Sequence, residues 1–215
     1  MKTTNQKNKP MRKLVLGAAM LLFAQFGFGQ GINDNAIIPV SVTLNSILRL
    51  TVVSGGNIEF VVNTIDDYSS GINSGGADTR YHTVFTVSSS QNFNVFLRSE
   101  TDNLLGQDNT TNDLPGDNVG YEVVAHATAG GVDGDNWDLV GSVVGLSATR
   151  ANVVDGIAAV ASGDPSAAGD AVQNHFQIEW RLGTLEGAMN TFTLLEQSLP
   201  ADRYVTNVFL ELESK

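Results

Sequence analysis

The chain has 215 residues, no cysteine, and 23 acidic against 12 basic residues, which gives a formal net charge of −11 at pH 7. The missing cysteine excludes disulfide bonds, thiolate metal sites and a cysteine nucleophile. The acidic balance argues against nucleic-acid binding, which needs lysine and arginine side chains to displace counterions from phosphates.

The first 29 residues have the composition of a secretory signal peptide. Five basic residues and no acidic residue accompany an apolar run that extends from Leu14 to Phe28. Gly27 and Gly29 put small side chains at the two positions that a signal peptidase recognises, so we predict cleavage after Gly29. The apolar run is shorter than the roughly 20 residues of a membrane-spanning helix, which argues against a retained anchor. Cleavage leaves one predicted domain, residues 30–215, with seven basic and 23 acidic residues and a net charge of −16.

Apolar and polar residues alternate along most of the remaining chain, which is the pattern of half-buried β-strands. The predicted strands cover residues 38–44, 47–53, 58–62, 81–88, 93–98, 119–126, 139–144, 175–182, 191–195 and 204–213. The Gly-rich turn at residues 54–57 predicts that the second and third strands form a hairpin. Polar residues predict long surface loops at 64–79 and 100–118. The spacing of Val153, Val154, Ile157 and Val160 predicts a short helix over residues 150–161.

Many short strands separated by turn signals predict an all-β fold, an antiparallel β-sandwich with long loops and one short helix. No alternation of strands with helices suggests a parallel sheet. No unit of fixed length recurs, which argues against a solenoid or a propeller.

Three stretches resemble one group of known proteins. They are IPVSVTLNSILRL at residues 38–50 with GNIEF at 56–60, VFTVSSSQNFNVFL at 84–97, and LPADRYVTNVFLEL at 199–212. These stretches are similar to the opening strand pair, the central strand–turn–strand unit and the closing strand of secreted immunoglobulin-like domains in bacterial fimbrial subunits and spore-coat-protein-U-type proteins. The resemblance implies an immunoglobulin-like sandwich, secretion, and assembly through strand addition. The chain departs from it because the disulfide of many such subunits is missing and residues 127–171 have no counterpart.

The first predicted strand is the best candidate for contact with a partner. Ile38, Val40, Val42 and Leu44 point to one side of it, and Pro39 cannot donate to a ladder, which indicates an edge strand. Such a strand either adds to a sheet of another chain or completes its own domain. We therefore expect a non-enzymatic structural or adhesive subunit at a bacterial surface or outside the cell. It would associate with itself or with other surface proteins and form fimbria-like filaments.

An acidic stretch offers a candidate calcium site. Asp133, Asp135 and Asp138 place carboxylate oxygens within six residues, which suits a hard cation. The late glutamate of an EF-hand loop is absent. A solvated acidic turn is the competing interpretation.

The remaining polar residues predict no catalytic site and no further cofactor. His82, His126 and His175 lie on separate predicted strands without the spacing of a zinc site. Tyr68, Tyr121 and Trp137 stand beside acidic and amide residues, as carbohydrate binding requires. A secreted carbohydrate- or calcium-binding β-sandwich module is therefore the alternative function.

Overall fold

The computed structural model describes residues 38–73, 79–126, 137–156 and 167–215. The chain divides into two units, residues 1–43 and residues 44–215, and only residues 38–43 of the first unit are described. The predicted signal peptide therefore lies outside the described residues. No helix in the described ranges is long and apolar enough to cross a membrane.

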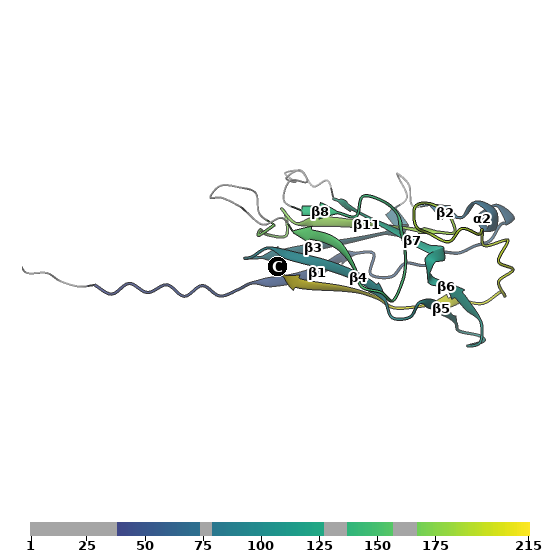
Figure 1. Cartoon of the computed structure of the whole chain (residues 1–215), viewed down its shortest axis with the longest axis horizontal. Coiled ribbons are helices and arrows are strands. Elements are labelled where there is room, and N and C mark those ends of the chain that lie inside the picture. The colour runs from purple at the N-terminus through teal and green to yellow at the C-terminus, as the bar shows by residue number, and fades with distance from the viewer. Residues whose placement is uncertain (1–37, 74–78, 127–136, 157–166) are drawn as a thin grey trace, which may run out of the picture. The chain divides into compact units, whose positions relative to one another are not determined.

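The second unit consists of antiparallel β-sheets with little helix, as the alternation predicts (Figure 1). The largest sheet has the strand order β1-β3-β11-β7-β9, and β2 pairs with β11. Its strands are β1 (Leu48–Ser54), β2 (Ile72–Asn73), β3 (His82–Ser89), β7 (Val119–Ala125), β9 (Val144–Gly145) and β11 (His175–Leu182). The second sheet has the order β13-β4-β10-β8. Its strands are β4 (Phe93–Ser99), β8 (Trp137–Leu139), β10 (Ala151–Gly156) and β13 (Val208–Ser214).

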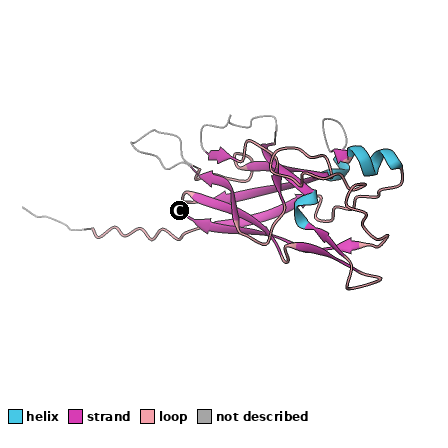
Figure 2. Cartoon of the chain, turned by 45° about the vertical axis from the view of Figure 1, so that its right-hand side comes forward, coloured by secondary structure: helices cyan, strands magenta, loops and turns pink. Residues whose placement is uncertain are grey.

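A third, small sheet and three helical turns complete the described part of this unit. The small sheet contains β12 (Tyr204–Val205), β5 (Asn103–Gly106) and β6 (Asp113–Pro115) in that order. The helical turns are α2 (Ile65–Ser70), η1 (Thr79–Tyr81) and η2 (Gly116–Asn118), drawn in cyan in Figure 2. Thr64 and Asp67 form a capping box at the start of α2, which explains why a helix forms inside a predicted loop.

The two larger sheets face each other across one hydrophobic core. Phe93 of β4 packs edge-on against Phe176 of β11, with ring centroids 6.5 Å apart. Trp180 of β11 donates its indole N–H to the Thr83 hydroxyl of β3 at 2.9 Å, so the polar edge of this buried ring has a partner. The inward positions predicted for residues 93–98 and 175–182 are confirmed, because Phe93, Val95, Leu97, Phe176, Ile178, Trp180 and Leu182 are all buried.

The predicted helix over residues 150–161 is wrong where the structure describes it. Residues 151–156 form β10, which pairs with β4 and β8. The β10–β4 register shifts between Asn152 and Val154, and this irregularity buries Val153 and Val154 together. Two consecutive buried valines break the period of two, which explains the false helical signal.

The predicted hairpin of residues 47–53 and 58–62 is also wrong. β1 pairs with β3 instead, and residues 58–62 belong to no sheet. Gly55 has a φ of 67°, and a Cβ atom there would overlap the His82 carbonyl oxygen. The Thr83 hydroxyl donates to the Gly55 carbonyl at 2.6 Å, which holds the bend where the chain leaves the sheet.

Four further segments differ from the prediction. Of the predicted strand at 139–144, only Leu139, at the end of β8, and Val144, at the start of β9, lie in strands. Residues 38–44 are assigned to no strand. The predicted loop at 100–118 contains β5 and β6, and residues 191–195 form turns rather than a strand. In the last case the Glu196 carboxylate accepts from the Thr193 backbone N–H at 2.9 Å, a local bond that favours a turn.

Candidate assembly interface

The segment of residues 38–44 carries apolar side chains that the described chain leaves in solvent. Ile38, Val40, Val42 and Leu44 are 80%, 84%, 78% and 90% exposed. Their alternation with polar residues puts all four on one side whenever this segment is extended. Burying one such side chain is worth about 1.5–3 kcal/mol, so this exposure leaves a large gain in free energy unrealised.

The core is also partly uncovered between two edge strands, β1 and β13. These strands lie side by side, and β1 begins at the end of the sheets where β13, yellow in Figure 1, reaches the C-terminus. Leu50 of β1 and Leu210 of β13 pack against the core. Their neighbours on the same faces are only half covered, with Val52 44% exposed and Val208 38% exposed. We call this region the edge seam; it is lined by Leu48, Leu50, Val52, Val208, Leu210 and Leu212.

Within the described ranges, the backbone of the edge seam has hydrogen-bonding groups that no neighbouring strand uses. The Ile47 carbonyl accepts from the Ser90 N–H at 2.9 Å, so alternate residues of β1 bond to β3. Leu48, Leu50 and Val52 therefore direct their N–H and C=O groups away from β3. The same argument holds for β13, because the Asn207 carbonyl accepts from the Glu100 N–H at 2.8 Å.

It follows that Val208, Leu210 and Leu212 direct their backbone groups away from β4. At both edges, the residues with free backbone groups are those whose side chains face the core. An added strand would therefore pair through residues that also point their side chains into the core.

Residues 58–62 form a strand-like stretch without a ladder. Ile58, Phe60 and Val62 are half-buried against the core, and the residues between them are exposed. Phe60 stacks on Tyr81 with ring centroids 4.6 Å apart. Within the described ranges, no backbone–backbone hydrogen bond holds residues 58–62. This stretch confirms the predicted alternation but not the predicted pairing.

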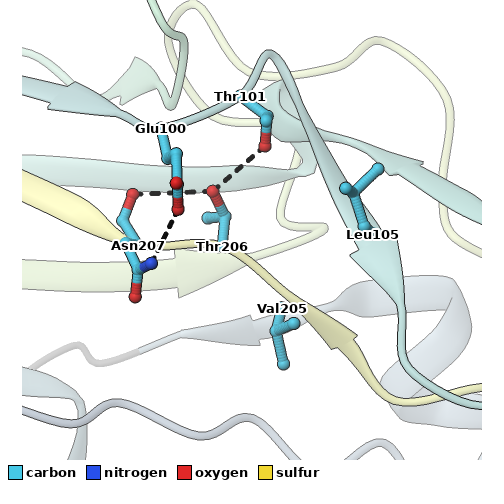
Figure 3. A pocket seen from close by; sticks show the side chains of 6 residues that line it. All are labelled: Glu100, Thr101, Leu105, Val205, Thr206 and Asn207. Carbon is cyan, nitrogen blue, oxygen red and sulfur yellow. Dashed lines mark hydrogen bonds between the residues drawn. The ribbon is translucent and has the colours of Figure 1, made fainter. Parts of the chain in front are cut away.

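A shallow hollow of about 250 Å³ lies where the chain enters β13 (Figure 3). Glu100, Thr101, Leu105, Val205, Thr206 and Asn207 line it. The Asn207 side-chain amide donates to the Glu100 carboxylate at 2.6 Å, and the hydroxyls of Thr101 and Thr206 are 3.3 Å apart. Leu105 and Val205 are cross-strand neighbours and form an apolar wall. The sequence offered no signal for this hollow, since its residues come from two predicted regions.

The predicted calcium ligands cannot be placed as a group. Asp133 and Asp135 lie outside the described residues, and only the backbone of Asp138 is described, in β8. Among the described residues, no cluster of three or more histidine, aspartate or glutamate side chains could hold a metal ion.

The three histidines share the outer face of the largest sheet, although they lie far apart in the sequence. His82 lies on β3, opposite Glu179 of β11, and His175 begins β11. The His126 ring stacks on the His175 ring with centroids 4.2 Å apart. Burial, together with the nearby His126 ring, lowers the pKa of His175 below its usual value of 6.5.

The aromatic residues considered for carbohydrate binding are not gathered on an open surface. Tyr121 is buried in the core, where its ring packs 5.9 Å from Trp180, and burial raises the pKa of its phenol to about 12. Tyr68 is half-buried against the same core. The side chain of Trp137 lies outside the described residues.

An arginine on the outer face of the largest sheet is buried. The Arg181 side chain is 9% exposed. It forms ion pairs with Glu122 at 3.0 Å, Glu186 at 2.8 Å and Glu179 at 3.8 Å. This cluster links β11 to β7 and to the loop after β11. Sequence reasoning missed it because its carboxylates come from three separate segments.

No protein-family model matches the chain, and no curated protein matches its sequence.

Proposed function

We propose that this protein is a non-enzymatic structural or adhesive subunit at a bacterial surface or outside the cell. In this proposal its packed sheets form an immunoglobulin-like sandwich, and subunits assemble into filaments by β-strand addition. The segment of residues 38–44 of one copy is the strand that is added. The observation that carries the proposal is the exposure of all four apolar side chains of this segment.

The edge seam of a second copy is the surface to which this strand would add. Burial of four side chains contributes about 6–12 kcal/mol before costs. Ordering seven residues opposes this gain by about 1–2 kcal/mol per residue. Burial alone therefore does not hold the strand, and the ladder hydrogen bonds of the free edges supply the remaining stabilisation. An added strand would also cover the half-exposed side chains of Val52 and Val208.

The net charge favours self-association in extended rather than compact form. Residues 30–215 carry a net charge of −16, so copies repel each other over long distances. When two copies are joined by an added strand, their contact is confined to a narrow apolar strip. The remaining acidic surfaces of the two copies then stay apart. Salt shortens the range of the repulsion, so assembly should become easier as ionic strength rises.

The test uses two variants that change the same segment on opposite sides. In residues 30–215, Val40→Asp with Val42→Asp puts two charges on the apolar side. Ser41→Asp with Thr43→Asp adds the same charge on the polar side. Sedimentation velocity and electron microscopy then compare both variants with the unaltered protein.

We expect filaments or ordered oligomers from the unaltered protein and from the polar-side variant, and only monomers from the apolar-side variant. A strictly monomeric unaltered protein would refute strand addition as its function. Equal assembly by the two variants would show that the apolar side is not the contact.

A further inference from the structure

Arg49 is an exposed arginine of β1 for which the described residues provide no ion pair. Five other basic side chains of the described chain are paired with carboxylates. These are Arg98, Arg150, Arg181, Arg203 and Lys215. Leu48 and Leu50 face the core, so Arg49 lies on the outer side of the edge strand. It follows the apolar segment of residues 38–44 by only five positions.

The hollow beside β13 has the chemistry that an arginine side chain needs. Glu100 is exposed, and none of the ion pairs among the described residues involves it. Leu105 and Val205 are 45% and 38% exposed, so they offer apolar surface to the methylene groups of a long side chain. In Figure 3 the carboxylate of Glu100 and the two apolar side chains border the same hollow. A guanidinium above this wall would meet the carboxylate in a charge-assisted hydrogen bond.

The direction of an added strand decides whether Arg49 can reach the hollow of another copy. Two edge strands could accept the added strand. The ladder between β13 and β4 is regular along its length, whereas the ladder between β1 and β3 shifts between Val52 and Ser54. We therefore take β13 as the accepting edge. Antiparallel pairing is also slightly more stable than parallel pairing. An added strand should therefore run antiparallel to β13.

The faces of the two strands and the length of β13 together select the register. Leu44 must point to the core, as Val208 does, and a hydrogen-bonded pair between these two residues lets residues 38–44 run along the whole of β13. Continuing antiparallel, residues 45–49 of the added chain pass residues 207–203 of the accepting copy. Five extended residues span about 17 Å, which carries Arg49 past Asn207 to the hollow.

We propose that Arg49 of one copy docks into the hollow of the next copy, with its methylene groups against Leu105 and Val205 and its guanidinium on Glu100. This inference rests on the proposed function, because it needs strand addition between two copies of the chain. The contact makes the joint specific for the same chain. It also gives the filament a head-to-tail order, since donor and acceptor lie on different surfaces.

A charge-swap experiment in residues 30–215 tests this contact. The variants are Arg49→Glu, Glu100→Arg, and both together; the double variant has the same net charge as the unaltered protein. The protein concentration at which half of the chain is assembled is measured by sedimentation at low salt. Thermal unfolding of each monomer controls for effects on the fold.

Each single variant should raise the half-assembly concentration about tenfold, and the double variant should restore it to within about twofold. Single variants that assemble like the unaltered protein would overturn the contact while strand addition stands. A double variant at least as impaired as the worse single variant would also overturn it. Failure of the unaltered protein to assemble would refute the proposed function together with this inference.

Discussion

Replacement of Arg181 by methionine should destabilise the fold strongly, because it removes the cation from three neighbouring carboxylates. Breaking a buried ion pair by removing one partner costs about 3–5 kcal/mol. Here Glu122 and Glu179 keep 26% and 21% of their side-chain surface in solvent, so part of the cost is relieved by hydration. We therefore expect a loss of about 2–3 kcal/mol, or about 4–12 °C in Tm for a domain of this size.

The matched control is Arg203→Met. Its partner is Glu59 at 3.5 Å, and the two side chains are 65% and 57% exposed. An exposed pair of this kind contributes about 0–1 kcal/mol. Urea unfolding followed by tryptophan fluorescence reports both variants, because Trp180 is buried in the core. If Arg181→Met loses no more stability than Arg203→Met, the cluster does not stabilise the sheet and the reasoning is wrong.

Three more perturbations test individual contacts of the fold. Gly55→Ala should lower the free energy of unfolding, measured with a chemical denaturant, by more than about 1–2 kcal/mol, because φ is positive and the new Cβ meets the His82 carbonyl. Gly56→Ala is the control and should change the free energy little, because its Cβ would lie 3.9 Å from Val52 Cγ1. His175 has a lowered pKa, so the unfolded chain binds more protons below pH 6.5; stability should fall as the pH drops from 6.5 through the folded pKa, and His175→Gln should flatten that dependence in thermal unfolding. The Asp108 N–H and the Asn112 amide lower the pKa of Asp202 to about 2; Asp202→Asn should therefore reduce Tm at pH 7, and its difference from the unaltered protein should shrink as the pH falls from 3.8 towards 2.

The sequence predicted the strands that lie in the middle of a packed sheet. β11 has a strict alternation, because one of its faces packs against the core along its whole length. β4 follows the same rule, whereas β3 buries consecutive residues on both of its faces. In such strands, burial of one face determines which positions are apolar, so the alternation of apolar residues predicts the strand.

The failed predictions come from residues whose environment depends on distant parts of the chain. Residues 58–62 alternate correctly, but alternation does not say which strand pairs with which. The bend at Gly55 diverts them from the ladder. Val153 and Val154 are buried together only because of an irregular register with β4. Arg181 reads as a solvent-facing residue until Glu122 and Glu186 are brought beside it.

The candidate interface was half predictable for the same reason. The apolar side of residues 38–44 is visible in the sequence, because alternation and Pro39 together indicate an edge strand. The edge seam is not visible, since it is formed by β1 and β13, which are more than 150 residues apart. The Glu100 hollow likewise depends on the pairing of β5 with β12.

Cysteine crosslinking between copies tests strand addition most directly, because the chain has no cysteine of its own. One sample of residues 30–215 carries Val42→Cys, and a second carries a single cysteine at Val208, Leu210 or Leu212. After mixing, assembly and mild oxidation, we expect a disulfide-linked pair of unlike variants, strongest at the position opposite residue 42 and absent when Ser41→Cys replaces Val42→Cys. Assembled material in which residue 42 links to none of these three positions would contradict the account.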